Sequence, residues 1–322
     1  MQEEIGTVQD EHRTKYVGLL GYPLGHSVSP PMQQAAFDHY GLDIRYEFWE
    51  TEPAELKNMR ERLLHPDTLG ANVTVPHKET ILPLLDDLDD LAYEIGAVNT
   101  IINRDGRLMG YNTDAGGFLQ ALRKEGNFDP AGKRALIIGA GGVAHAVTFA
   151  LARAGVRSLF VTDIITRRAQ QLADKLAHSL RRTQGPPPRS CYDAKDIGGV
   201  QSLDFNVYPI PDIKVSSPKG LPFRKALAEC DLLVNCSPVG MKHSITEGKS
   251  PVEAKLLHSG LLVYDVVYNP LETQLILDAR KAYARTLGGL SMLVNQGATA
   301  FEMWTGKQAP YDIMFEAAKG AL

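Results

Sequence analysis

The sequence has few cysteines, no long apolar run and no excess charge of either sign. Its 322 residues include three cysteines, Cys191, Cys230 and Cys236, without C-x-x-C spacing. Three cysteines cannot form an even disulfide framework, so we expect free thiols in a reducing cytoplasm. The nine histidines show neither H-E-x-x-H nor a paired Cys/His pattern. The sequence therefore predicts no metal site.

Long hydrophobic segments are also missing. No run approaches the ~18 apolar residues of a membrane span, and residues 1–15 lack the apolar core of a secretory signal. Lys and Arg number 34 against 38 Asp and Glu, a formal net charge of −4. This balance offers no electrostatic footprint for nucleic acid or for an anionic membrane. We therefore expect a cytoplasmic protein that has neither of them as a partner.

The residues that are present have the composition of a globular protein, 44% hydrophobic and 22% charged. The chain is longer than the roughly 250–300 residues at which a single core stops growing, which favours two domains. Short apolar runs alternate with amphipathic ones, a rhythm that predicts an α/β fold with a largely parallel sheet. In the first third, we expect strands at 16–20, 46–49 and 71–75, and helices at 32–40, 53–64 and 77–85.

A second unit of the same kind begins near Arg134. Between its elements, the stretch from Pro186 to Pro222 holds seven of the 19 prolines. Proline removes backbone donors and blocks helix interiors, so we expect mostly loop there. The strands expected in this unit are 134–138, 158–162, 232–235 and 261–267, and the helices are 143–154, 168–180, 223–229, 290–305 and 313–322.

A glycine turn joins the first strand and helix of the second unit, in the sequence G-A-G-G-V-A at 139–144. This strand–turn–helix context is what the dinucleotide fingerprint requires. Gly139 would make the tight turn, Gly141 would let backbone approach a pyrophosphate, and Ala144 would allow close helix packing. Amides at the helix N-terminus would bind the phosphates.

Asp163 follows Gly139 by 24 positions, at the end of the next expected strand. An acid at this spacing binds the ribose 2′-hydroxyl of NAD and repels a 2′-phosphate. The alternative is a turn or helix-capping aspartate. Arg167 and Arg168 lie close behind and could instead pair with a 2′-phosphate. The sequence therefore favours NAD(H) and leaves NADP(H) open.

Eight motifs follow one another along the chain: GHSVSP at 25–30, GANVTVPHK at 70–78, GAVNT at 96–100, YNTD at 111–114, GAGG at 139–142, NCSPVGM at 235–241, YDVVYNP at 264–270 and MLVNQ at 292–296. In order and spacing they resemble the shikimate dehydrogenase family, from about residue 16 to residue 306. The resemblance implies an NAD(P)-dependent oxidoreductase that reversibly reduces 3-dehydroshikimate to shikimate in chorismate biosynthesis. It also implies a substrate domain of residues 1–118 plus 290–322 and a Rossmann domain of residues 119–289, with the Pro-rich insertion inside it.

Oxidising a secondary alcohol requires a group that takes the hydroxyl proton as hydride leaves. Lys78 and Asp114 are residue types that suit this task, and the resemblance makes them the catalytic pair. Taken alone, a solvated lysine and a turn aspartate would be commoner. A hydroxylated ring acid also needs many polar partners. The resemblance gives the substrate carboxylate to Ser27 and Ser29 with Tyr268 in support, and the ring hydroxyls to Asn72, Thr74, Asn99 and Gln296.

The resemblance assigns a cofactor role to twelve residues, and it gives no catalytic role to His26 or His77. The twelve are Gly139, Ala140, Gly141, Gly142, Val143, Asp163, Arg168, Ser237, Met241, Val266, Gly289 and Met292.

One motif departs from the family pattern. NADP-dependent members carry Asn-Arg-Thr where this chain has Asp163-Ile164-Ile165, so the arginine that contacts the 2′-phosphate is missing. This resembles the quinate/shikimate dehydrogenase branch, whereas the serine pair is typical of members that prefer shikimate. An NAD-dependent quinate/shikimate dehydrogenase of quinate catabolism therefore stays open. A catalytically silent dinucleotide-binding regulator is a further alternative, against which the retention of Lys78 and Asp114 counts. Monomer and homodimer both stay open.

Overall fold

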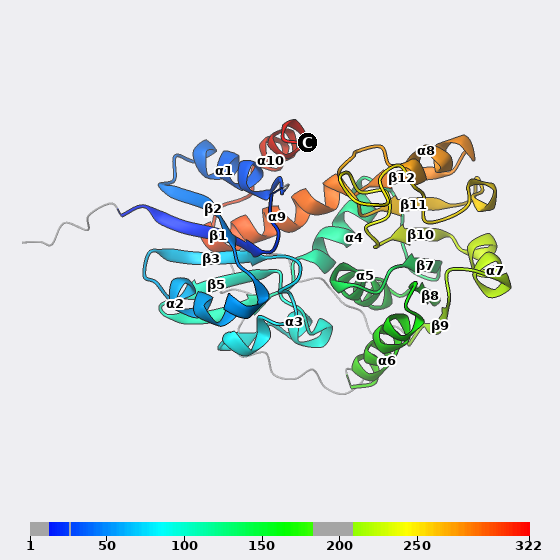
Figure 1. The fold of residues 1–322 in the computed structure, drawn as a ribbon, viewed down its shortest axis with the longest axis horizontal. Coiled ribbons are helices and arrows are strands. Elements are labelled where there is room, and N and C mark those ends of the chain that lie inside the picture. Colours follow the sequence, from blue (N-terminus) through cyan, green and yellow to red (C-terminus); the bar gives the residue numbers. More distant parts are fainter. Residues whose placement is uncertain (1–12, 26, 183–208) are drawn as a thin grey trace, which may run out of the picture.

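Two six-stranded sheets, one in each half of the chain, organise the computed structural model (Figure 1). The structure describes residues 13–25, 27–182 and 209–322. These ranges leave out residues 1–12, His26, Cys191 and most of the Pro-rich insertion. The expectations for those residues therefore concern positions outside the described residues. Within the described part, no helix is both long and apolar enough to span a membrane.

The first half contains strands β1 (Lys15–Gly21), β2 (Ile44–Glu50), β3 (Thr68–Val73), β4 (Asp87–Leu88), β5 (Thr100–Arg104) and β6 (Arg107–Tyr111), and helices α1 (Ser29–His39), α2 (Met59–Leu63), α3 (Asp90–Ile95) and α4 (Asp114–Lys124). The strand order is β2-β1-β3-β5-β6-β4. β1 runs parallel to β2 and β3, and β5 runs antiparallel to β3 and β6. The parallel part brings the carboxyl ends of β1 and β3 to one edge.

The second half contains strands β7 (Arg134–Ile138), β8 (Ser158–Thr162), β9 (Asp212–Ser216), β10 (Leu232–Asn235), β11 (Leu262–Asp265) and β12 (Arg285–Gly288), and helices α5 (Gly142–Arg153), α6 (Thr166–Arg182), α7 (Leu221–Glu229), α8 (Gln274–Lys281), α9 (Leu290–Thr305) and α10 (Tyr311–Gly320). All its pairings are parallel, in the order β12-β11-β10-β7-β8-β9. This is the doubly wound Rossmann order, whose direction reverses between β7 and β10. The predicted α/β fold class is confirmed.

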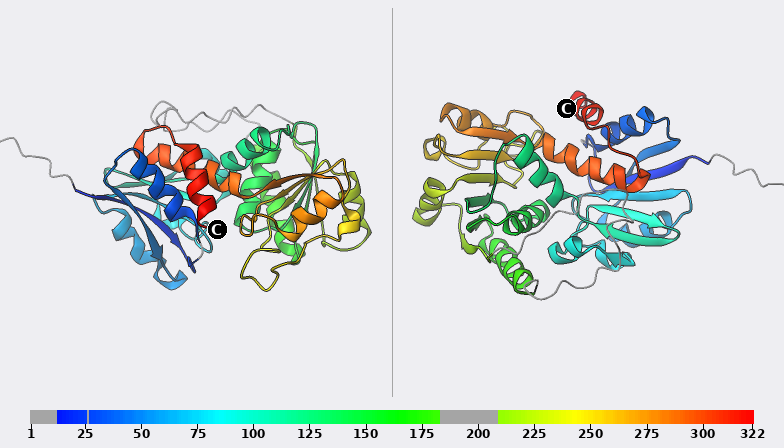
Figure 2. Two further views of the ribbon diagram at one scale, coloured as in Figure 1. Left: turned by 90° about the horizontal axis from the view of Figure 1, so that it is seen from above. Right: turned by 180° about the vertical axis from the view of Figure 1, so that it is seen from behind.

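Clusters of buried apolar side chains pack against the two sheets, and helices flank each sheet (Figure 2). Phe37 of α1 and Phe301 of α9 share a core on one face of the first sheet, with ring centroids 5.4 Å apart. In the second half, Phe118 of α4 stacks on the buried Tyr264 of β11 at 5.0 Å. The helices α4 and α9 pack side by side between the two sheets (Figure 1). The C-terminal helices thus return to the first sheet, while the domain boundaries drawn from the sequence stay a prediction.

The first half differs from its sequence prediction in several places, and two of these differences have a clear physical reason. The helix expected at 77–85 is wrong, because only a single 3₁₀ turn forms, at Leu82–Leu84. Pro83 lies inside that stretch, where its ring and missing N–H disfavour an α-helix. The second difference is the antiparallel hairpin of β5 and β6, which the expected rhythm omitted. Asp105 and Gly106 form its turn, with φ values of 50° and 81°, as a tight hairpin of type I′ requires.

The described cysteines, Cys230 and Cys236, are free and buried, as expected. Burial raises the pKa of the Cys230 thiol to about 12, and burial also raises the pKa of Cys236. Both thiols therefore stay protonated and unreactive at neutral pH.

Candidate active site

A pocket lies where the loops that follow β1 and β3 face α4 and α9. All nine residues predicted to bind or transform the substrate line it: Ser27, Ser29, Asn72, Thr74, Lys78, Asn99, Asp114, Tyr268 and Gln296. Four residues predicted for the cofactor line its other wall: Val143, Val266, Gly289 and Met292. Residues far apart in the sequence thus meet at one place between the two sheets. The pocket also includes Leu19, Val73 and Leu293, apolar residues that the sequence did not single out.

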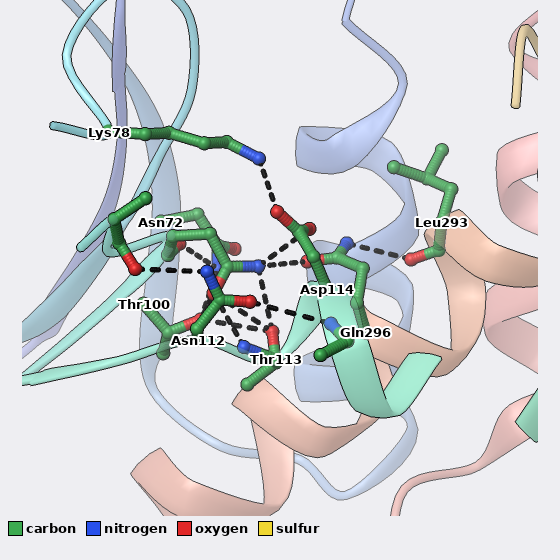
Figure 3. A network of polar contacts seen from close by, with 11 residues as sticks. Asn72, Lys78, Thr100, Asn112, Thr113, Asp114, Leu293 and Gln296 are labelled. Atoms are coloured by element: carbon green, nitrogen blue, oxygen red, sulfur yellow. Dashed lines mark hydrogen bonds and ion pairs between the residues drawn. The ribbon is translucent and has the colours of Figure 1, made fainter. Parts of the chain in front are cut away.

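Lys78 and Asp114 form an ion pair at the centre of this pocket (Figure 3). The Lys78 Nζ donates to Asp114 Oδ2 at 2.5 Å, and the two side chains are 16% and 8% exposed. Lys78 follows β3, and Asp114 is the first residue of α4, where a carboxylate is favoured by the helix dipole. Because the pair is largely screened from water, its attraction is stronger than that of a surface pair.

Asn99 connects this pair to other residues of the pocket by hydrogen bonds. Its amide nitrogen lies 2.9 Å from Thr113 Oγ1, 2.9 Å from Asp114 Oδ1 and 3.2 Å from Gln296 Oε1. Its carbonyl oxygen accepts from the Thr113 backbone N–H at 2.7 Å, which fixes the orientation of the amide. Gln296 of α9 is held in turn, because its Nε2 donates to the Leu293 carbonyl at 2.7 Å. A single buried network therefore joins α4, α9 and the end of the first sheet.

Asn72, on β3, is oriented by a residue that the sequence did not single out. The Tyr46 hydroxyl donates to Asn72 Oδ1 at 2.8 Å, and Asn72 Nδ2 lies 3.2 Å from both Asn99 O and Thr100 Oγ1. Both amide hydrogens are thereby used within the protein. A second lone pair on Oδ1 is what Asn72 can offer to a ligand, so it would accept a hydrogen bond from a ligand hydroxyl.

Tyr46 could have been found from its place in the sequence. It lies on β2, whose residues Ile44, Tyr46 and Trp49 are buried. A buried tyrosine nearly always finds a partner for its hydroxyl. Burial raises the pKa of Tyr46, so the phenol remains a donor.

The two serines and Tyr268 also line the pocket. Ser27 Oγ accepts from the Ser29 backbone N–H at 3.2 Å, which folds the two serines into one turn at the start of α1. Burial raises the pKa of the Tyr268 hydroxyl, which therefore stays a neutral donor. The pocket lining thus includes three hydroxyls, each of which is able to donate to a carboxylate.

His77 is fully buried outside the pocket. Its Nε2 lies 2.7 Å from the Thr51 carbonyl oxygen. This contact links the loop after β3 to the segment after β2, which is a structural role. Among the described residues, no group of three or more His, Cys, Asp or Glu side chains could hold a metal ion.

The glycine turn after β7 reaches the other side of the pocket. Gly139 has a φ of +98°, and a Cβ there would come within 2.9 Å of the Cys236 backbone, so only glycine suits this position. Gly141 faces open space, and α5 starts at Gly142 without a side-chain cap. Uncapped amides at a helix N-terminus suit a phosphate-bearing ligand. A Cβ on Gly142 would lie 3.8 Å from Lys78 Cδ, so the turn adjoins the ion pair. The residues present therefore fit a dinucleotide.

The other predicted cofactor residues, which are the three glycines of the turn and five further residues, lie outside the pocket lining. Ala140 belongs to the turn, and Asp163 follows β8. Ser237 and Met241 follow β10, and Arg168 is exposed near the start of α6. All of them belong to loops at the carboxyl edge of the second sheet or to the helix that follows one. Ligands of open α/β sheets bind along this edge.

The carboxylate of Asp163 is held by the backbone at this edge. Its Oδ2 accepts from the Ala140 backbone N–H at 2.9 Å, and its Oδ1 accepts from the Ile165 N–H at 2.8 Å. The side chain therefore ties the glycine turn to the loop after β8. Beside it, Ile164 is 89% exposed, and Arg167 and Arg168 are exposed at the start of α6.

Comparisons with known proteins agree with this arrangement. The model of the shikimate dehydrogenase substrate binding domain matches residues 19–101, and that of the shikimate 5′-dehydrogenase C-terminal domain matches residues 289–319. A shikimate dehydrogenase (NADP(+)) of Moorella thermoacetica is 41% identical over 98% of this chain and 96% of its own. One of Symbiobacterium thermophilum is 41% identical over 96% and 95%. The Thermus thermophilus shikimate 5-dehydrogenase, solved with NADP(H) and shikimate, is 33% identical and covers 96% of this chain and 100% of its own, with a TM-score of 0.77.

The expectation that NAD(H) is favoured is wrong. Both curated relatives are named as NADP(+) enzymes, and the solved relative holds NADP(H). In the structure, Asp163 accepts one backbone N–H at each oxygen and ties the glycine turn to the loop after β8. The exposed Arg167 and Arg168 beside it are cations of the kind that a 2′-phosphate needs. Spacing along the chain placed this aspartate at the end of β8, and the structure adds its two contacts with backbone N–H groups.

Proposed function

The chain belongs to the shikimate dehydrogenase family, and from that premise we propose that it catalyses the reversible NADP-dependent reduction of 3-dehydroshikimate to shikimate. The enzyme is an oxidoreductase acting on a CH–OH group. One observation carries the proposal: the pocket brings the Lys78–Asp114 pair together with seven hydroxyl, amide and phenol side chains. A hydroxylated ring acid needs that many polar partners, because each of its polar groups must be paired on leaving water.

The substrate would be held by its two ends. Ser27, Ser29 and Tyr268 donate to the carboxylate, while Asn72, Thr74, Asn99 and Gln296 contact the ring hydroxyls. The supporting contacts are those that fix the amides before a ligand arrives: the Thr113 N–H donates to Asn99 Oδ1, and Gln296 Nε2 donates to the Leu293 carbonyl. Preorganised groups lose little entropy on binding.

Lys78 is the group that moves the proton. In the reducing direction its ammonium donates a proton to the oxygen that develops negative charge, and in the oxidising direction the amine takes it back. Asp114 accepts from Lys78 through Oδ2 and from Asn99 through Oδ1. Each of these oxygens keeps a further lone pair, so Asp114 can also accept from the substrate hydroxyl. When bound, the nicotinamide supplies or accepts the hydride.

The dinucleotide would lie along the carboxyl edge of the second sheet. Its phosphates suit the amides at the start of α5, and its nicotinamide end suits Val143, Val266, Gly289 and Met292, which line the pocket. Arg167 and Arg168 are the exposed cations beside the loop after β8. They are suited to pair with a 2′-phosphate.

Initial rates of the purified protein test this proposal. Oxidation of shikimate with NADP⁺ is followed by the absorbance of the reduced cofactor, with quinate and NAD⁺ as the alternative partners. We expect the largest kcat/KM for shikimate with NADP⁺. A higher kcat/KM for quinate would overturn the substrate, and no turnover of either acid, with tight dinucleotide binding, would favour a silent regulator.

A further inference from the structure

A buried carboxylate lies next to the active site and takes no part in the chemistry described above. Asp265 is the last residue of β11, is 0% exposed, and does not line the pocket. It accepts three hydrogen bonds: at Oδ1 from Asn235 Nδ2 at 2.9 Å and the Val267 N–H at 3.1 Å, and at Oδ2 from Thr273 Oγ1 at 2.6 Å. Burial of a carboxylate has a high desolvation cost, which its hydrogen-bond partners must offset.

The first of these bonds leads to the loop after β10. Asn235 ends β10, and its Oδ1 accepts from the Ser237 backbone N–H at 3.0 Å and from Ser237 Oγ at 2.6 Å. Its Nδ2 also lies 3.3 Å from the Val239 carbonyl. Asp265 therefore fixes the orientation of the Asn235 amide, and that amide holds the loop at 237–239.

The second bond fixes the chain between Val266 and Tyr268. These two residues line the pocket on either side of Val267, whose N–H is held by Asp265. A Cβ on Gly289 would come within 2.0 Å of the Val266 carbonyl oxygen, so the start of α9 packs directly on the same backbone. The third bond reaches Thr273, whose hydroxyl caps α8 by accepting from the Ile276 N–H.

We propose that Asp265 is a positioning residue that locks three loops of the second sheet together and thereby sets the cofactor wall of the pocket relative to Tyr268. The inference rests on the proposed function, because it assigns Tyr268 to the substrate and Val266 to the cofactor side. Hydrogen bonds to a charged acceptor are stronger than those between neutral groups. Burial raises the pKa of Asp265 to about 6, so the carboxylate is ionised at pH 7 to 8.

The variant Asp265→Ala tests the proposal when the KM for shikimate and the KM for NADP⁺ are both measured. Loss of the carboxylate frees both loops at once, so we expect the KM values for shikimate and for NADP⁺ both to rise about tenfold, a change typical of losing a charged hydrogen bond. Asp265→Asn keeps an acceptor oxygen for Asn235 and Val267 and should recover most of this loss. Thr273→Val removes one donor without changing the charge and should raise both constants by a smaller factor.

Asp231→Asn is the matched control. Asp231 lies at the opposite end of β10, where its Oδ2 accepts from the Arg134 backbone N–H at 2.8 Å. It also ties two neighbouring strands of the sheet, but at the edge away from the pocket. We expect Asp231→Asn to lower thermal stability and to leave both KM values unchanged.

Two results would overturn the inference. One is an Asp265→Ala protein that melts at a lower temperature with both KM values unchanged. The other applies if Asp265→Ala fails to fold: then Thr273→Val decides, and unchanged KM values contradict the proposal. A wild-type protein inactive on shikimate refutes the proposed function instead. In that case NADP⁺ binding to wild type and to Asp265→Ala, or to Thr273→Val if the alanine variant does not fold, is measured by calorimetry and tests the cofactor half alone. Equal affinities would contradict it.

Discussion

The carboxyl edges of the two sheets are built from different groups. At the first sheet, buried side chains bond to one another, so that Lys78, Asp114 and Asn99 form one network open to the pocket. At the second sheet, the side chains bond mostly to backbone, as Asp163 does with the glycine turn. Asp114 and Asp163 are both aspartates in the loop that follows a strand, yet one faces the pocket and the other holds a loop. The position of a residue in the sequence therefore predicts where it lies in the fold better than it predicts which group it bonds to.

The largest expected effect is on turnover at the first edge. Replacing Lys78 by Met removes the proposed proton carrier, and general acid–base catalysis contributes about 10²–10⁴-fold. We expect kcat for shikimate oxidation to fall by about that factor, measured as initial rates at saturating substrate. Lys57→Met, an exposed lysine of the same half, is the control and should leave kcat unchanged. A kcat within a few fold of wild type in Lys78→Met would refute the role.

A second effect concerns the stability of the second edge. Burial raises the pKa of Asp265 from an ordinary 3.8 to about 6. The folded state therefore takes up a proton that the unfolded state lacks between these values, and the stabilisation is lost as pH rises through 6. Over that window, the free energy of unfolding of wild type relative to Asp265→Asn should fall by about 3 kcal/mol.

Urea unfolding of both proteins at several pH values spanning this window measures the difference. The buried thiol of Cys236 is the neighbour on which the Asp265 charge acts, and it stays protonated throughout. A difference between the two proteins that does not change with pH would contradict the prediction.

A third effect sharpens the contrast between Asp114 and Asp163. Asp163→Ser loses the two bonds from the backbone N–H groups of Ala140 and Ile165. If Asp163 only holds the glycine turn, kcat/KM should fall by about tenfold with NADP⁺ and with NAD⁺ alike. A carboxylate that repelled the 2′-phosphate would instead raise the ratio of NADP⁺ to NAD⁺ activity in the variant. Kinetics with both cofactors separate the two outcomes.

The smallest expected effect is at Tyr46. Tyr46→Phe removes the donor to Asn72 Oδ1 and keeps the ring. The loss of a neutral hydrogen bond of about 1 kcal/mol should raise the KM for shikimate about fivefold, with kcat little changed. Tyr283→Phe, at an 86% exposed tyrosine, is the matched control. Equal KM values in the two variants would show that Tyr46 does not orient Asn72.

Four parallel strands of the second sheet, β7, β8, β10 and β11, could be predicted from the sequence, because each is a short apolar run. The edge strands β9 and β12 were missed, because they carry few buried apolar residues. The hairpin of β5 and β6 also had a local signal in Asp105-Gly106, which favours a two-residue turn. The helix expected at 77–85 failed because Pro83 outweighs the amphipathic spacing around it. In both cases, the turn or helix-breaking residues determined the local structure, and the periodicity of apolar residues did not reveal it.

The candidate site was predicted residue by residue from the ordered motifs, and all of its substrate-side members line one pocket. Tyr46 and Asp265 escaped because their partners are distant in sequence: Tyr46 bonds to Asn72 across the sheet, and Asp265 bonds to Asn235, 30 residues away. Which of several donors meets a buried acceptor depends on the packing of strands, which sequence spacing does not contain.

At the carboxyl edge of the first sheet, we assign proton transfer to Lys78 and binding of the acid to the surrounding hydroxyls and amides. Calorimetric binding of shikimate to Lys78→Met saturated with NADP⁺ tests this division most directly. We expect a Kd within about fivefold of wild type despite the lost turnover, because only one of the polar partners is removed. A Kd that rises as steeply as kcat falls would contradict it, since Lys78 would then serve binding rather than the chemical step.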